Sequence, residues 1–187
     1  MKLDSILTGT IQGSIISQDN YVRFSLKNSD GIFGVQVRGA AQINACQVVM
    51  KNELVLLPTS VFSYRHAVCG QHHTMFKAHA VIPAKDTDVT RPTTQVTVCG
   101  SIASLISINS SGQARFSIKN KDGIFLVTIQ KRIQKQLCKA LKIGEIVYIT
   151  AQPKSFYHPK CKKMHVSLEA RTVIVGQKTT DSNLIDL

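Results

Sequence analysis

The sequence predicts a mostly β protein that consists of two tandem five-stranded Greek-key barrels, each with one helix between its third and fourth strands. The first observation is an internal repeat: residues 23–82 match residues 115–174 at a constant spacing of 92, and 21 of the 60 pairs are identical. The second observation is that each copy contains five runs of β pattern and one helical stretch. Two copies of about 90 residues are too few and too long for a solenoid, so we interpret them as two small domains.

The first strand is expected at 6–17, a long β run that contains Gly9 and Gly13. Glycine inside a strand pattern indicates a bulge or a sharp bend, which a strand needs when it coils around a barrel. The second strand is expected at 21–27, where apolar and polar residues alternate and Phe24 lies on the core face.

A turn that ends in Asp30-Gly31 joins the second strand to the third, because an Asp-Gly pair favours the positive φ angles of tight hairpins. The third strand is expected at 32–38. Its alternation predicts that Phe33 points into the core and that Gln36 points outward.

The helical pattern runs from Gly39 to about Lys51 and ends at Asn52. The fourth strand is expected at 54–66. The fifth is expected at 74–82, with Ile82 on the core face.

The second copy repeats this order, and the four repeated phenylalanines fall on core faces: Phe24, Phe33, Phe116 and Phe125. Five strands with a helix between the third and fourth is the order of the OB fold. The predicted organisation is an OB-fold domain at 1–83, a linker at 84–94, a second OB-fold domain at 95–175, and a short mobile tail at 176–187.

Two stretches of the second copy resemble the bacterial single-stranded DNA-binding protein family. Residues 141–152, LKIGEIVYITAQ, are similar to the family stretch L-x-K-G-x-x-V-Y-I-x-G. Residues 96–102, VTVCGSI, are similar to the opening strand V-x-L-x-G-x-L of that family and of its primosomal replication protein branch. The resemblance covers most of each copy, although its motifs mostly encode barrel geometry.

This resemblance implies a protein that binds single-stranded DNA with little sequence preference, in replication, recombination or mobile-element DNA processing, and requires no cofactor. By analogy with members that carry two OB domains per chain, it implies a homodimer that presents four OB domains, with replication or recombination proteins as further partners. Two features depart from the family. The chain has no tryptophan on which bases could stack, and the segment 176–187 lacks a strongly acidic tip.

The charge of the chain also favours a polyanionic partner. The net charge is +12, and it is unevenly distributed: residues 1–90 hold eight Lys or Arg against six Asp or Glu, and residues 91–187 hold 15 against five. We therefore expect the second copy to supply most of the electrostatic attraction to nucleic acid. A membrane surface, an acidic protein, and a charge that serves only solubility are the competing explanations of this charge.

Candidate nucleic-acid contacts are the outward basic residues and the aromatic residues near the hairpin between the fourth and fifth strands. Cationic side chains bind phosphates, and flat rings stack on bases of any sequence. The competing interpretation of each is solvated surface or packing at the barrel rim. The candidates are Arg23, Lys27, Arg38, Phe62, Tyr64, Arg65, Lys77, Arg115, Lys119, Lys121, Lys131, Arg132, Lys154, Phe156, Tyr157, Lys160, Lys162, Lys163 and Arg171.

A repeated His-x-x-Cys-x-x-x-His pattern falls in the same hairpin of each copy, at His66, Cys69 and His73 and again at His158, Cys161 and His165. Because the two histidines of each pattern flank a six-residue turn, we expect them to face each other across the hairpin with the cysteine above them. Imidazole and thiolate are zinc ligands, so zinc is one interpretation. DNA contact and plain packing are the other two. The fourth ligand of a zinc site could be Cys46 or Cys138, or His72 in the first copy.

An enzyme is not expected, because the chain has no Gly-rich phosphate loop, no His-Glu-x-x-His and no nucleophile elbow. Three rival functions stay open: an RNA-binding OB protein, a replisome or primosome adaptor, and a metal-dependent enzyme built on the His/Cys pattern. No apolar run reaches the ~20 residues of a membrane span, no secretory signal is visible, and five cysteines fit reduced thiols, so a cytoplasmic protein is expected.

Overall fold

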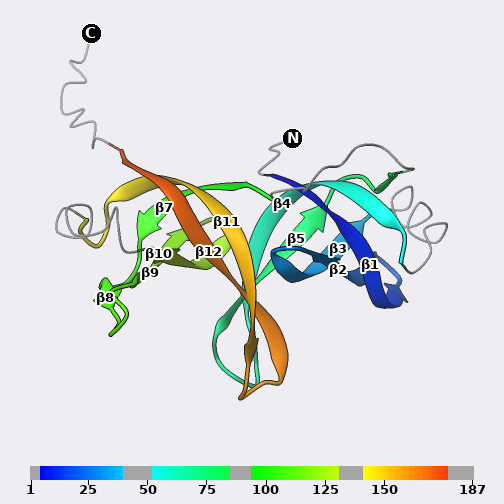
Figure 1. The fold of residues 1–187 in the computed structure, drawn as a ribbon, viewed down its shortest axis with the longest axis horizontal. Helices are drawn as coiled ribbons and strands as arrows, with labels where there is room; N and C mark the ends of the chain where they lie inside the picture. The colour runs from blue at the N-terminus through cyan, green and yellow to red at the C-terminus, as the bar shows by residue number, and fades with distance from the viewer. Residues whose placement is uncertain (1–4, 40–51, 85–93, 131–140, 177–187) are drawn as a thin grey trace, which may run out of the picture.

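The computed structural model describes residues 5–39, 52–84, 94–130 and 141–176. Within them, twelve strands form one sheet that closes on itself twice, which gives two barrels side by side (Figure 1). The helical stretches predicted before Asn52 and Gly144, the linker and the tail lie wholly or mostly outside the described residues. The predicted domain boundaries therefore stay a prediction. No helix among the described residues has the length and apolar character needed to cross a bilayer.

The first barrel closes in the order β1, β2, β3, β5, β4 and back to β1. Only the β3–β5 pairing is parallel, since the fourth and fifth strands form a hairpin that packs against the third. The elements are β1 (Ser5–Gln18), β2 (Tyr21–Asn28), β3 (Gly31–Arg38), β4 (Leu54–Arg65), β5 (His72–Ala78) and the short β6 (Ile82–Pro83).

The second barrel closes in the same order, β7, β9, β10, β12, β11 and back to β7, again with one parallel pairing, β10–β12. Each barrel thus has the Greek-key strand order of an OB fold. The two share one sheet through Ser5 and Val96 on β1 and β7. The elements are β7 (Val96–Ile102), β8 (Ser107–Ile108), β9 (Ala114–Asn120), β10 (Gly123–Ile129), β11 (Ile146–His158) and β12 (Lys163–Val175).

The barrel interiors are filled by the side chains that strand alternation places inward. All four repeated phenylalanines are buried, which confirms the prediction for them. Burying a phenylalanine of this kind contributes about 1.5–3 kcal/mol relative to leaving it exposed. The glycine prediction also holds for the first strand, because Gly13 has a φ of 75° and lies where the β1–β2 register shifts.

One orientation prediction was wrong, and one outward side chain is buried. Gln36 lies on the outer face but is only 1% exposed, because β3 lies between β2 and β5 and its register neighbours are the long side chains of Arg23 and Lys77. Ile82 does not point into the core and is 47% exposed. The fifth strand ends at Ala78, so the strand alternation that placed Ile82 inward stops before that residue.

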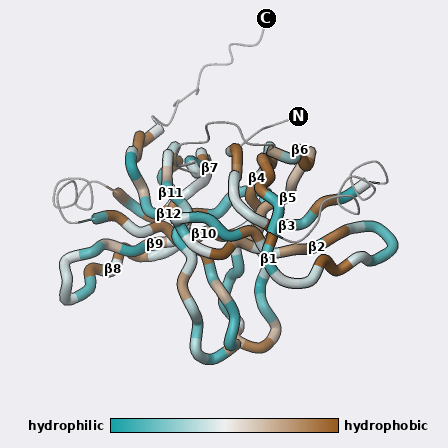
Figure 2. The backbone as a smooth tube through the Cα atoms, turned by 45° about the vertical axis from the view of Figure 1, so that its right-hand side comes forward, coloured by the Kyte–Doolittle hydropathy of each residue, from teal (hydrophilic) through white to brown (hydrophobic). Residues whose placement is uncertain are grey.

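The β4–β5 and β11–β12 hairpins extend below the barrels and meet there (Figure 1). Strands β4 and β11, with 12 and 13 residues, are longer than most of their barrel partners, so their ends continue beyond the closed part of each sheet. In Figure 2 the tip of the β11–β12 hairpin, which carries Lys160 and Lys162, is coloured hydrophilic.

Candidate nucleic-acid interface and hairpin junction

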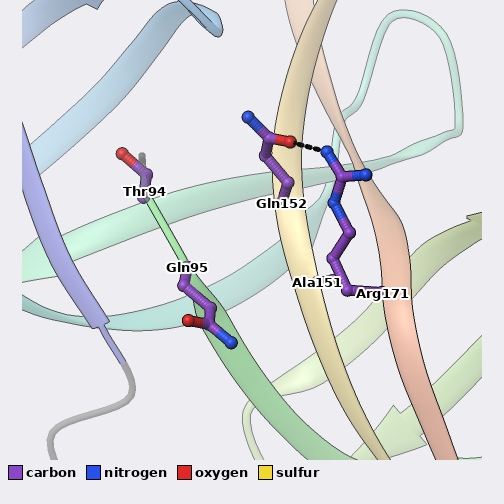
Figure 3. A pocket seen from close by; sticks show the side chains of 5 residues that line it. All are labelled: Thr94, Gln95, Ala151, Gln152 and Arg171. Carbon is purple, nitrogen blue, oxygen red and sulfur yellow. Dashed lines mark hydrogen bonds between the residues drawn. The ribbon is translucent and has the colours of Figure 1, made fainter. Parts of the chain in front are cut away.

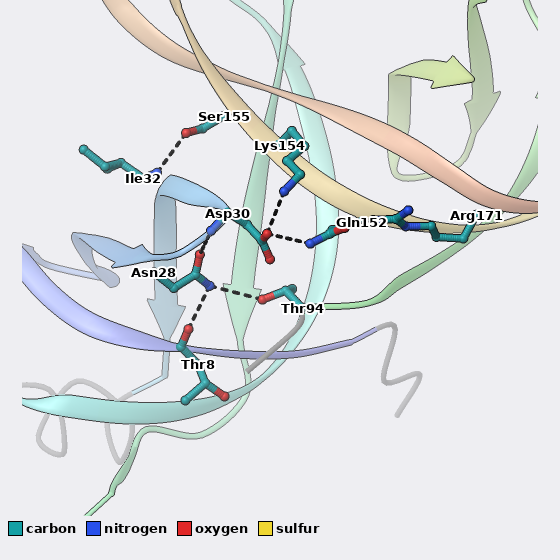
Figure 4. A network of polar contacts seen from close by, with 9 residues as sticks. All are labelled: Thr8, Asn28, Asp30, Ile32, Thr94, Gln152, Lys154, Ser155 and Arg171. Atoms are coloured by element: carbon teal, nitrogen blue, oxygen red, sulfur yellow. Dashed lines mark hydrogen bonds and ion pairs between the residues drawn. The ribbon is translucent and has the colours of Figure 1, made fainter. Parts of the chain in front are cut away.

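The β2–β3 turn of the first barrel docks on β11 of the second (Figure 4). Asn28 shapes this turn: its Oδ1 accepts a hydrogen bond from the Asp30 amide at 2.8 Å, and its Nδ2 donates to the Thr8 carbonyl at 2.9 Å. The turn then binds Ser155, whose Oγ accepts a hydrogen bond from the Ile32 amide at 2.8 Å.

The second barrel repeats this contact in the opposite direction. Ser63 on β4 is the counterpart of Ser155, and its Oγ accepts a hydrogen bond from the Ile124 amide at 2.7 Å. The Ser63 amide donates to the Asp122 carbonyl at 2.9 Å. Each barrel therefore inserts its own turn against the long hairpin of the other.

An ion pair reinforces one of these two contacts. The ammonium of Lys154 lies 2.8 Å from Oδ1 of the buried Asp30, and Gln152 Nε2 donates to the same oxygen at 2.5 Å. Lys154 was expected to contact nucleic acid. In the structure its charge is paired with the other barrel, so it also holds the junction together.

The His/Cys residues lie where the two hairpins meet. In the first hairpin the rings of His66 and His73 stack with centroids 4.4 Å apart, and Cys69 Sγ lies 3.6 Å from His66 Nδ1 and 3.4 Å from His73 Nε2. The histidines thus face each other across the hairpin, as the spacing predicted, and the Cys69 thiol lies beside a ring nitrogen of each.

The second hairpin has the same geometry. The His158 and His165 rings stack at 4.4 Å, and Cys161 Sγ lies 3.5 Å from His158 Nδ1 and 3.1 Å from His165 Nε2. The two clusters also touch each other, since Cys161 Sγ is 3.9 Å from His73 Nε2. Burial, helped by the neighbouring His165, lowers the pKa of His73 to about 4, and burial likewise lowers the pKa of His165.

The outer face of each barrel carries a row of three residues in register across its strands. In the first barrel the row is Arg23, Gln36 and Lys77. Arg23 Nε and Gln36 Nε2 are buried and have no hydrogen-bond partner among the described residues. The guanidinium of Arg23 lies 4.6 Å from the centre of the Tyr21 ring. This face therefore carries two cationic side chains in one row, of which the Lys77 ammonium is exposed.

The matching row of the second barrel is Arg115, Thr128 and Glu169, so an acid stands where the first barrel has Lys77. Here the face is hollowed into a groove of about 320 Å³, which Phe156 also lines. A second groove of about 250 Å³ adjoins the first, because Leu126 and Phe156 line both of them.

The second groove is formed by both barrels, since residues 70–72 of the β4–β5 hairpin line one side of it. The Phe156 ring, which is 39% exposed, also packs against His165 with centroids 5.6 Å apart. Tyr64 is its counterpart in the first barrel and lies 5.7 Å from His73. Two aromatic side chains therefore flank the histidine junction and remain accessible.

A third hollow of about 250 Å³ lies near the start of β7, between Thr94 and Arg171 (Figure 3). The guanidinium of Arg171 on β12 donates a hydrogen bond to the Gln152 side chain on the neighbouring strand β11, on one side of this hollow. Gln152 also reaches Asp30, so Arg171 is connected to the barrel junction.

The structure gathers only some of the predicted nucleic-acid residues. Arg115, Lys154 and Phe156 meet in one groove, and Phe62 and Tyr64 lie on the outward side of β4, with Tyr64 near Arg23. Lys131 and Arg132 lie outside the described residues. The remaining candidates are exposed but line none of these grooves: Lys27, Arg38, Arg65, Lys77, Lys119, Lys121, Tyr157, Lys160, Lys162 and Lys163.

Sequence reasoning missed the residues that join the barrels, which are Asp30, Ser63, Asp122 and Ser155. The repeat contained a signal for them, because both the aspartate and the serine are identical in the two copies. Glu169 and Gln113, which line the larger groove, differ between the copies and left no such signal.

No protein-family model and no curated protein matches this sequence. Among solved structures, the chain is similar to a deletion mutant of the single-stranded DNA binding protein from Thermus aquaticus, with a TM-score of 0.70, 12% identity and 94% of each chain covered. The wild-type protein from Thermus aquaticus gives a TM-score of 0.69 at 11% identity, with 94% of this chain and 93% of that chain covered. At these identities the likeness shows the fold, over nearly the whole length of both chains.

Proposed function

We propose that this protein binds single-stranded DNA with little sequence preference, through the outer faces of both barrels, and acts without catalysis. The observation that carries the proposal is the row formed by Arg23, Gln36 and Lys77. Arg23 and Lys77 place two cations on this face, on either side of Gln36. The Lys77 side chain is exposed to an incoming strand. Phosphate oxygens of a strand that crosses this face would bind these cationic groups.

The grooves of the second barrel support the same function. Phe156 is an accessible ring on the shared wall of the two grooves, and Arg115 lies beside it. Stacking on such a ring contributes about 1–3 kcal/mol per base, whatever the base. A strand held in this way is recognised by its unpaired bases and its phosphates, so the proposal includes no sequence readout.

The exposed lysines of the β11–β12 hairpin supply longer-range attraction. Lys160, Lys162 and Lys163 are exposed at its tip, within a half of the chain that carries a net charge of +10. Releasing counterions from DNA at such sites makes binding salt-dependent. The structural neighbours from Thermus aquaticus, described as single-stranded DNA binding proteins, agree with this function.

The proposal extends to the origin of the two barrels, the oligomeric state of the protein and the cellular process in which it acts. We infer that the two barrels arose by duplication of one OB module, since the repeat and the strand order coincide. A homodimer would cover the apolar surface at Tyr148 and Ile174, which pair across β11 and β12 and are 50% and 59% exposed. Replication, recombination or mobile-element DNA processing are the settings that such a protein serves.

The test is fluorescence anisotropy of the full-length protein with labelled oligo-dT, mixed-sequence single strands, matched duplex and matched RNA, over a range of salt. We expect tight binding to both single-stranded DNAs, weaker binding to duplex, and a linear fall of log affinity with log salt. Tighter binding to RNA would favour an RNA-binding protein. Binding to none of the oligonucleotides would overturn the proposal and favour a protein-interaction adaptor.

A further inference from the structure

We propose that the hairpin junction is a metal centre, in which Cys69 and Cys161 bridge two Zn²⁺ ions and each ion is completed by the two histidines of one hairpin. Two groups of four ligand atoms exist in the described residues. One consists of His66, His73 and both cysteines, and the other of His158, His165 and both cysteines. Within each group, all ligand atoms lie within 4.8 Å of one another.

The distances fit four-coordinate zinc. With Zn–S near 2.3 Å and Zn–N near 2.0–2.1 Å, neighbouring ligand atoms of a tetrahedron are roughly 3.5 Å apart. The Sγ-to-nitrogen distances within the hairpins are 3.6, 3.4, 3.5 and 3.1 Å, and the distance between the hairpins, from Cys161 to His73, is 3.9 Å. Each thiol therefore stands at a tetrahedral edge from several imidazole nitrogens at once.

The number of ligands also fits a bridged pair. Two separate four-coordinate ions need eight donor atoms, whereas two ions that share two thiolates need six. The junction supplies six, four imidazoles and two thiols. Two thiolates offset half of the charge of two Zn²⁺ ions, and imidazole with thiolate is a donor set that suits zinc.

Neither hairpin can complete a site alone, which separates this centre from the site expected within each hairpin. The sequence suggested His72, Cys46 or Cys138 as the fourth ligand. His72 is exposed and belongs to neither group, and the two cysteines lie outside the described residues. The cysteine of the opposite hairpin takes this place, so the metal would hold the two barrels in one orientation.

This inference stands apart from the proposed DNA binding, because it rests on the ligand geometry alone. The first experiment is elemental analysis of the full-length protein, purified under reducing anaerobic conditions and dialysed against buffered Zn²⁺. We expect two zinc ions per chain. The Cys99→Ser variant removes a thiol outside both ligand groups and should also retain two. The Cys46→Ser/Cys138→Ser double variant should do the same, since the proposed centre does not use these cysteines.

Variants of the proposed ligands should lose zinc, in contrast to these control variants. Cys69→Ser and Cys161→Ser each remove a bridge and should disturb both ions, whereas His66→Ala should mainly weaken the ion of its own hairpin. Substitution with Co²⁺ provides a direct view: a thiolate-to-cobalt charge-transfer band should appear in the wild type and disappear in the double cysteine variant. Because bridged ions couple magnetically, the electron paramagnetic resonance signal should rise with the first equivalent of Co²⁺ and fall with the second.

Three outcomes would overturn the centre. One zinc per chain, with no loss of the resonance signal at the second equivalent of Co²⁺, would exclude the bridged pair. No zinc at all, with the charge-transfer band absent, would exclude a metal site. A Cys69–Cys161 disulfide in metal-free protein that re-forms after reduction would assign the thiols to a covalent link instead. None of these outcomes depends on whether oligonucleotides bind.

Discussion

His73 and His165 occupy equivalent positions in the two copies, and their rings lie with centroids 3.6 Å apart at the point where the hairpins meet. A contact between equivalent residues marks the axis of a two-fold arrangement. The reciprocal contacts of Ser63 and Ser155 with the opposite turns lie on either side of it. The single chain therefore contains an interface of the kind that joins two subunits of a symmetric dimer.

Removal of metal should loosen this interface. At a free zinc concentration about 1,000-fold above its Kd, zinc binding stabilises the folded protein by about 4 kcal/mol. For a chain of this size, that raises the Tm by roughly 8–16 °C. We expect a strong chelator to lower the Tm of wild type and of Cys99→Ser by such an amount, measured by differential scanning calorimetry. In Cys69→Ser/Cys161→Ser, the Tm should start low and not respond to the chelator.

The turns that dock across the junction should not tolerate a side chain at their glycines. A Cβ at Gly123, where φ is 130°, would overlap the Ser63 side chain, whereas a Cβ at Gly13, where φ is 75°, would meet no atom within 4 Å. Gly13→Ala should therefore cost only the backbone strain, about 1–2 kcal/mol. Gly123→Ala should cost roughly 3 kcal/mol or more, because strain and overlap combine.

Urea denaturation of both glycine variants measures this difference. Gly31→Ala provides a second copy of the test, because its Cβ would overlap Ser155. Equal losses in Gly13→Ala and Gly123→Ala would mean that the turns do not dock on the opposite hairpins.

Variants of Lys154 on β11 and Lys162 in the β11–β12 loop should affect different properties: the first mainly the stability of the fold, and the second mainly the affinity for DNA. Lys154→Gln leaves the buried Asp30 carboxylate without its cation and should lower the free energy of unfolding by about 1–3 kcal/mol, less than for a fully buried pair since Lys154 is partly exposed. Lys162→Gln changes an exposed side chain and should alter stability by less than ~0.5 kcal/mol. It should instead lower the slope of log affinity against log salt by about 1. The reverse pattern would contradict both assignments.

The exposed apolar surface at Tyr148 and Ile174 on the second barrel predicts a homodimer. Ile174→Glu places a charge beside Tyr148 and should convert a homodimer to a monomer, as measured by sedimentation velocity. Leu105→Glu changes an exposed apolar residue away from these strands and serves as the control. A wild-type protein that stays monomeric at high concentration would remove the homodimer from the proposal.

Local patterns in the sequence were enough to predict the strand order, the tight turns and the phenylalanine cores, because each depends on alternation within a few residues. They also indicated that His66 and His73 face each other across the hairpin, where their rings stack although the register partner of His73 is Tyr64. The approach of Cys161 to His73 could not be predicted. It depends on how two closed barrels pack, and no periodicity within one copy encodes this.

The same limit explains Gln36 and Lys154. Alternation gives the direction of a side chain, whereas burial depends on the neighbours in register, and Gln36 lies between two long cationic side chains. Lys154 has the sequence pattern of a free basic residue, because its partner Asp30 is 124 positions away in the chain.

The two outer faces give the most direct test of the DNA-binding proposal, because equivalent positions carry opposite charges. Lys77 completes the row of the first barrel, and Glu169 completes that of the second. If a strand crosses both faces, Lys77→Gln should weaken binding to oligo-dT and Glu169→Gln should strengthen it. Each change should be about 1 kcal/mol, or about fivefold at low salt, as expected for one charge near a phosphate at the protein surface.

The combined Lys77→Gln/Glu169→Gln variant should return close to wild-type affinity, since the two positions are on different barrels and their effects should add. Anisotropy titrations at two salt concentrations measure all four proteins, and both single effects should shrink as salt rises. If Glu169→Gln leaves affinity unchanged while Lys77→Gln weakens it, DNA follows only the first barrel, despite the larger charge of the second half. If neither variant changes affinity, the strand does not cross these rows.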